Sequence, residues 1–246
     1  MTHSLKVNVY FTEPAPLARA LWLQNLLSPV VETCRFEQVP PLEVRPTGRW
    51  GGWKESKDSA LDGRVCVSNK LVFWTSENLI VVYLHEAAHR LLEGKIVMAH
   101  GPEFFCLNAA LLLRADQFFF GDSLNKIGFY DLQDRPDAHG FHDENWAGQV
   151  LNWGLSTARE LVKTETESSA EQLCVLVCQR WKDFLQQRKA DQVAAEQQSS
   201  KRLLLDRQQL QLLSQIDNSR WLWRVLALAG WLSFFIVCLI VTRVLL

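Results

Sequence analysis

The chain has 246 residues, of which 48% are hydrophobic and 22% are charged. This composition is typical of one folded domain with appendages, and it excludes a wholly disordered or collagen-like chain. The 26 basic and 27 acidic residues nearly balance, which argues against a domain that binds nucleic acid by neutralising its phosphates.

The front of the chain is predicted to mix strands and helices. Residues 6–11 alternate like a strand, and a helix is expected from about residue 12 to residue 27. Residues 40–63 are polar and loop-like, and residues 64–74 have strand character. An α+β fold with a small sheet is therefore predicted for this half.

Two helices are predicted next. Ser76 can cap a helix that runs to about Glu93 and ends at Gly94, because glycine readily adopts the left-handed conformation of a helix terminus. Pro102 is a favoured first residue for a second helix, which continues to about Phe120.

The rest of the chain is predicted to be helical, because residues 155–229 contain neither glycine nor proline. Residues 185–219 are rich in glutamine and place Leu205, Leu212, Leu213 and Ile216 on one helical face. A short coiled coil, which would allow self-association through residues 185–220, a helix lying on a membrane and a simple spacer all fit this pattern.

The C-terminal segment is predicted to be a membrane anchor. Residues 225–242 carry no charge and as a helix would span about 27 Å, close to the hydrocarbon thickness of a bilayer. Trp221 and Trp223 lie where interfacial aromatic residues belong, and the arginines nearby lie mostly before the span. With no secretory signal at the N-terminus, residues 1–220 are expected in the cytoplasm.

The six cysteines, at positions 34, 66, 106, 174, 178 and 238, are too sparse and irregular for a disulfide-rich secreted scaffold. A reducing compartment is expected.

The first of the two central helices carries the sequence His85-Glu86-Ala87-Ala88-His89, an HExxH motif. Two imidazoles four residues apart lie one above the other on a helix and can share one Zn²⁺, and Glu86 can accept a proton from a water beside the metal. The surrounding residues are apolar, so a helix without metal would have to bury these polar groups at a cost. The alternative is a helix at the surface whose histidines only form hydrogen bonds.

A third metal ligand is expected because catalytic zinc usually takes three from the protein. His100 is the leading choice, since a turn at Gly94 can bring it back at the start of the next helix. The metzincin spacing is absent, because its third histidine would fall at Lys95. Glu93 and Glu103 are the competitors.

HEAAH, the later HGPEF and the strand-like RVCVSNKLVFW before them make residues 60–110 resemble the SprT-like zinc metallopeptidases, the group that includes Spartan. The resemblance implies a zincin-like domain with a small sheet packed on the HExxH helix. It implies His85, His89 and His100 as zinc ligands and Glu86 as the catalytic residue. It also suggests that residues 64–68 edge the cleft and pair with a substrate peptide.

The chain departs from that family in two respects. The paired CxxC motifs of a zinc ribbon are missing, and Cys174 and Cys178, four residues apart on a predicted helix, are expected to be small core residues rather than ligands. The predicted anchor and the near-neutral charge also do not suit repair of DNA–protein crosslinks, so no nucleic-acid partner is expected.

Two other polar or aromatic segments remain open. His139, His142, Asp143 and Glu144 gather in residues 131–146, which form either a solvated connector, a second metal site or a source of a transition-state donor. Trp50 and Trp53 either line a substrate groove or cover the core.

Together these features predict a membrane-tethered zinc metallopeptidase that cleaves protein or peptide substrates with water. Its catalytic domain is placed in residues 1–150, a helical stalk in residues 151–220 and the anchor in residues 221–246. The alternative is an anchored binding protein with a structural zinc or none, and a nucleic-acid-linked protease is a third reading.

Overall fold

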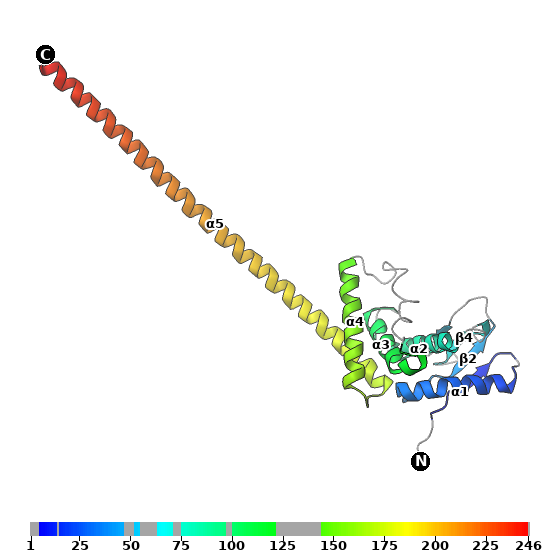
Figure 1. Ribbon diagram of the computed structural model, residues 1–246. Helices are drawn as coiled ribbons and strands as arrows, with labels where there is room; N and C mark the ends of the chain where they lie inside the picture. The colour runs from blue at the N-terminus through cyan, green and yellow to red at the C-terminus, as the bar shows by residue number, and fades with distance from the viewer. Residues whose placement is uncertain are drawn as a thin grey trace. The chain divides into compact units, whose positions relative to one another are not determined.

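The computed structural model describes residues 5–13, 15–46, 52–54, 63–70, 75–96, 100–121 and 144–245. By its internal packing the chain divides into two units, Met1–Phe184 and Leu185–Leu246. The first unit holds the sheet and most helices, and the second is the rest of one long helix (Figure 1). The first unit extends beyond residue 150, where the predicted catalytic domain ends.

A small mixed sheet lies in the first unit, with the strand order β1-β2-β4-β3. β1 (Val9–Phe11), β2 (Leu42–Arg45) and β4 (Val65–Ser68) are parallel, and β3 (Gly52–Lys54) pairs antiparallel with β4. The strands at residues 6–11 and 64–74 were predicted, although both are shorter than expected. The loop predicted for residues 40–63 is wrong in part, because β2 and β3 lie within it.

The apolar face of the sheet packs on helices α1 (Leu17–Cys34) and α2 (Ser76–Leu92). α1 begins and ends later than predicted and contains Pro29. α2 also contacts α3 (Pro102–Arg114), and α3 contacts α4 (Glu144–Thr164) (Figure 1). α2 is therefore enclosed between the sheet and α3.

The signals that begin and end α2 are local. The Thr75 hydroxyl accepts a hydrogen bond from the Asn78 backbone N–H at 3.3 Å, so Thr75 rather than Ser76 is the cap. Gly94 follows the last turn with φ +73°, the left-handed conformation that favours glycine. The Tyr83 hydroxyl, in the middle of α2, donates to the Pro40 carbonyl at 2.7 Å and fixes the helix against the residues before β2.

α3 begins at Pro102 as predicted and ends at Arg114, after which η2 (Asp116–Phe119) forms a short 3₁₀ turn. α4 crosses it closely, because a Cβ on Gly154 would lie 2.5 Å from the Phe105 ring. Only a residue without a side chain fits at this point.

The helical second half is confirmed, with one break between α4 and α5 (Ala170–Leu245). Ser169 and Gln172 form a capping box at the start of α5: the Ser169 hydroxyl accepts from the Gln172 N–H, and the Gln172 amide oxygen accepts from the Ser169 N–H. The turn is tied to α3, since the Arg114 guanidinium donates to the Glu165 carbonyl at 2.6 Å.

Glu43, on the inner strand β2, is a buried carboxylate with 2% of its surface exposed. It accepts hydrogen bonds from Arg45 and, at 2.8 Å, from Arg64, whose guanidinium lies over the Tyr10 ring. Burial acts to raise the pKa of Glu43, but the hydrogen bonds from the two arginines outweigh it and leave that pKa below its ordinary value of about 4.5.

The free energy of unfolding should therefore depend on Glu43 in a pH-dependent way. The lowered pKa adds stability above the unfolded value, and this contribution is lost as the pH falls through the folded pKa. Glu43→Gln should cost about 2 kcal/mol at pH 7 and clearly less near pH 3, measured by urea unfolding followed by tryptophan fluorescence. Glu167→Gln, which breaks an exposed pair with Arg35, should cost less than about 1 kcal/mol. Equal losses for both variants would contradict this account.

Candidate metal centre

The two histidines of the HExxH motif lie one turn apart on α2. Because helical side chains at positions i and i+4 project from the same face, both rings point to the same side of α2. Their Nε2 atoms are 3.2 Å apart. Eleven residues of this helix are buried, and the two histidines are half-buried at its surface.

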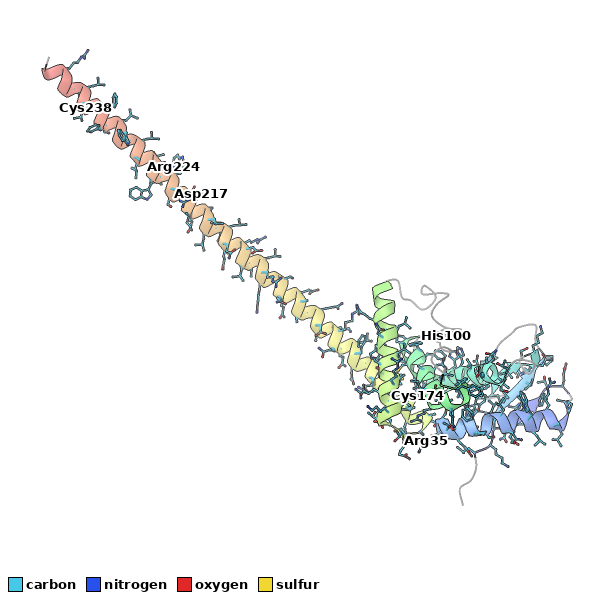
Figure 2. The ribbon with its side chains drawn as sticks, viewed as in Figure 1. Arg35, His100, Cys174, Asp217, Arg224 and Cys238 are labelled. Atoms are coloured by element: carbon cyan, nitrogen blue, oxygen red, sulfur yellow. The ribbon has the colours of Figure 1, made fainter. Side chains whose placement is uncertain are left out.

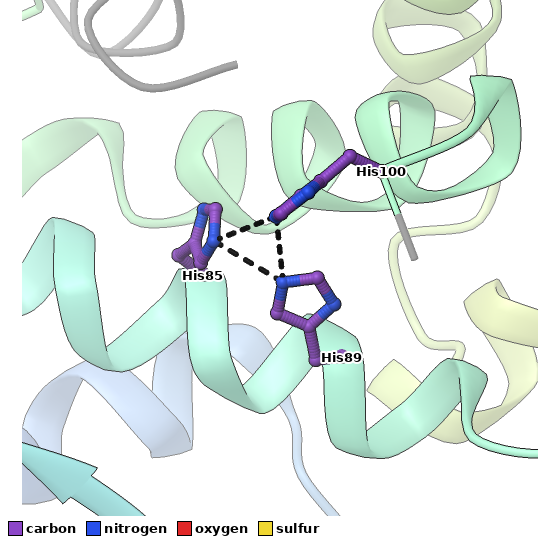
Figure 3. Close-up of side chains that lie close together, drawn as sticks. All are labelled: His85, His89 and His100. Atoms are coloured by element: carbon purple, nitrogen blue, oxygen red, sulfur yellow. Dashed lines mark hydrogen bonds between the residues drawn. The ribbon is translucent and has the colours of Figure 1, made fainter. Parts of the chain in front are cut away.

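His100 comes back to this pair immediately before α3. Its Nε2 lies 2.9 Å from Nε2 of His89 and 3.4 Å from Nε2 of His85. Figure 3 shows the three rings pointing their Nε2 atoms toward one another. The structure thus brings together the three histidines that the sequence singled out.

Hydrogen bonds alone do not account for this triangle. A neutral imidazole nitrogen either donates or accepts, so each favourable contact needs one donor and one acceptor. Among three nitrogens that all contact one another, at least two must both be donors or both be acceptors. That pair cannot form a hydrogen bond. A cation accepting all three lone pairs satisfies every nitrogen at once, and convergent imidazoles are ligands for Zn²⁺ and several other first-row metals. The residues therefore fit a bound metal.

Phe104 holds the three rings in place. Its fully buried ring stacks on His89, with centroids 4.1 Å apart, and meets His85 and His100 edge-on at 4.9 and 5.0 Å. One aromatic side chain therefore orients all three candidate ligands. No role was predicted for Phe104, although it belongs to the HGPEF motif and follows His100 by four residues.

Glu86 is buried, with 6% of its surface exposed, and follows His85 on α2. At about 100° per residue, its side chain leaves the helix about 60° from that of His89. The carboxylate therefore originates beside the face that carries the histidines.

The two carboxylates considered as alternatives to His100 have other surroundings. Glu93 lines a small cavity of about 170 Å³ with Arg90, Lys95 and Glu171. Burial raises the pKa of Glu103 above its ordinary value, against the opposing effects of its own backbone N–H and Lys182. Neither belongs to the cluster of candidate ligands found among the described residues, which consists of the three histidines.

Cys174 and Cys178 are core residues, as expected. Cys174 is fully buried and donates from Sγ to the Leu91 carbonyl at 3.2 Å, and the Lys95 ammonium donates to the same carbonyl at 2.6 Å. Cys178 packs against the core beside it. These contacts attach the start of α5 to the end of the helix that carries the histidines.

The strand at residues 64–68 is not free to pair with a substrate peptide, as the family resemblance had suggested. β4 lies between β2 and β3, so partners of its own chain already occupy both of its sides. Among the described strands the edges are β1 and β3, and β3 also contacts α2.

Several predicted features lie outside the described residues. They include Trp50, His139, His142 and Asp143, together with the side chains of Trp53 in β3 and Glu144 in α4. Their proposed roles stay predictions.

Comparison with known proteins gives no further assignment. No family model, curated protein or solved structure matches this chain.

Proposed function

We propose that the chain is a zinc-dependent metallopeptidase of the SprT-like, zincin type. The convergence of His85, His89 and His100 around one point, with a buried glutamate on the helix that carries the first two, supports this proposal. The order HEAAH then HGPEF, which resembles that family, supports it.

The three histidines would hold the metal. Zinc in such a site lowers the pKa of a bound water toward neutrality and polarises a substrate carbonyl. Glu86 would accept a proton from the attacking water and then donate it to the leaving amine, so one carboxylate serves as base and acid in turn. Phe104 would keep the imidazoles in the orientation that binding requires.

The number of ligands favours catalysis over a purely structural role. Structural zinc sites are usually closed by four protein ligands, whereas catalytic sites use three and leave a position for water. The cluster has three ligand groups within the described part of the chain, and all three are half-buried.

A substrate peptide would bind along β3. Extended peptides often add to a sheet edge by main-chain hydrogen bonds, and β3 is an edge strand that contacts the metal-site helix. This places the substrate one strand further out than the sequence suggested.

The C-terminal helix would tether the enzyme to a membrane, with residues 1–220 on the cytoplasmic side. One window of 18 residues in α5 has a mean hydropathy of 2.0, and none of it is buried in the protein. An apolar helix of this kind, exposed along its length, is stable in lipid and poorly soluble in water.

The test is cleavage of an unfolded protein such as β-casein by the full chain purified in detergent. Zinc-loaded protein should produce fragments, a chelator should stop cleavage, and added zinc should restore it. Zinc binding without any cleavage would contradict the peptidase proposal and favour an anchored binding protein with a structural metal.

A further inference from the structure

The second unit, residues 185–246, presents a helix face that nothing in its own unit covers. Every residue from Lys189 to Ile240 is exposed, including eight leucine and isoleucine side chains before the apolar span at residue 225 (Figure 2). We propose that this face binds a second copy of the same chain, giving a parallel dimer that continues from the stalk into the membrane span.

One narrow stripe runs along both parts of the helix. At about 100° per residue, its members fall within an arc of about 60°. They are Leu205, Leu212, Ile216, Trp223, Ala227 and Gly230, and the polar Gln209 and the aromatic Phe234 lie in the same arc. The stripe includes three of the four stalk residues whose shared face was recognised in the sequence, and extends that face across the predicted membrane boundary.

The membrane end of the stripe contains two small residues that line a groove, called the notch, and the packing of this chain does not require them to be small. Ala227 and Gly230 line a groove of about 440 Å³ together with Trp231 and Phe234. A Cβ added to Gly230 would meet no side chain or more distant backbone within 4 Å, whereas Gly154 is required by the ring of Phe105. Glycine costs helix stability, and in membranes it is favoured where two helices approach closely.

One pair of opposite charges beside the stripe favours a parallel partner, and Arg202 and Arg220 lie on the same side of the stripe as its acidic member. Lys201 and Asp206 flank it on opposite sides, five residues apart. In a parallel two-helix coil this is the spacing of the flanking positions that face each other across the interface. Lys201 of each copy would therefore meet Asp206 of the other, and the pair would form twice by symmetry.

A second copy is the occupant that matches the whole stripe. Lipid could cover the notch but not the stalk, and a soluble protein could cover the stalk but not the notch. Two copies anchored in the same orientation bring every stripe residue opposite its own equivalent. The membrane half of this inference rests on the proposed anchor, and neither half depends on the metal site.

The experiment is disulfide crosslinking of the full chain in phosphatidylcholine vesicles, at low protein-to-lipid ratio and with Cys238 replaced by serine. Two single variants each place one thiol on the stripe: Ile216→Cys in the stalk and Gly230→Cys in the membrane span. Ser214→Cys and Leu232→Cys, each two residues away, place it on the opposite face at nearly the same depth. Diamide is the oxidant.

The stripe variants should form covalent dimers with roughly fivefold greater yield than their matched controls, and the parent chain should form almost none. In unlinked protein, Gly230→Ile should lower the dimer fraction while Leu232→Ile leaves it unchanged. Equal yields on both faces, dimers only from the control positions, or no dimer from either stripe position would overturn the proposal. Zinc content and cleavage are measured separately, so failure of the peptidase proposal remains distinguishable.

Discussion

Glu86→Gln is expected to abolish peptide hydrolysis while zinc binding is retained. Glutamine keeps the size of the side chain but cannot take up the proton that the attacking water must lose. General acid–base catalysis contributes about 10²–10⁴-fold to a rate, so kcat should fall by at least about 100-fold. Because Glu86 is not among the three candidate ligands, the metal content should stay the same.

The matched control for this substitution is Glu103→Gln. Glu103 lies one residue after the start of α3 and close to His100 in sequence, but its carboxylate is not part of the histidine cluster. Its replacement should leave both zinc content and kcat near wild type. A Glu86→Gln protein that still cleaves β-casein at the wild-type rate would exclude Glu86 as the general base.

Phe104→Ala is expected to weaken both the fold and the metal site. Removing a fully buried phenylalanine ring typically costs about 3–5 kcal/mol in the free energy of unfolding. Losing the one ring that contacts all three imidazoles should also lower zinc affinity by about 10–100-fold, the usual effect of removing a group that orients ligands. Urea unfolding and competition with a fluorescent zinc chelator measure the two effects.

Phe105→Ala separates these effects. Phe105 is the next residue on α3 and is similarly buried, but its ring packs on Gly154 of α4. It should lose comparable stability and keep zinc affinity within about threefold of wild type. If both variants lost zinc affinity equally, Phe104 would have no special role at the site.

The candidate site could be predicted well because its signals are local. The spacing of His85 and His89 fixes their common face on any helix, and Gly94 and Pro102 mark where the chain must turn back and start again. These signals predicted that His100 would return to the pair, and the structure brings the three histidines together. The HGPEF motif includes Phe104, but its contacts with all three imidazoles are tertiary and could not be predicted from the motif.

The sheet was harder to predict for physical reasons. β2 and β3 are short and lie among prolines, glycines and charged residues, so their own sequences carry little strand preference. The buried charge on Glu43 is tolerated only because Arg45 and the distant Arg64 reach it. The family resemblance placed β4 at the edge of the cleft, and nothing in the local sequence reveals that β3 pairs on its far side.

The prediction for the helical half was correct about the helices but missed the break between them. The absence of glycine and proline correctly indicated helix, but it concealed the break between α4 and α5. That break has a sequence signal of another kind, the serine and glutamine three residues apart at 169 and 172, which form the observed capping box. In α1 the opposite error arose, since Pro29 lies inside a helix that continues to Cys34.

The most direct test of the central claim is the metal content of the full chain purified in detergent, measured by mass spectrometry beside His100→Ala. The three-histidine site predicts about one zinc per folded chain, and a loss of most of that zinc in the variant. Circular dichroism would establish that both proteins remain helical. A folded wild-type chain without bound metal, or equal zinc in both proteins, would contradict the assignment of His85, His89 and His100 as a metal centre.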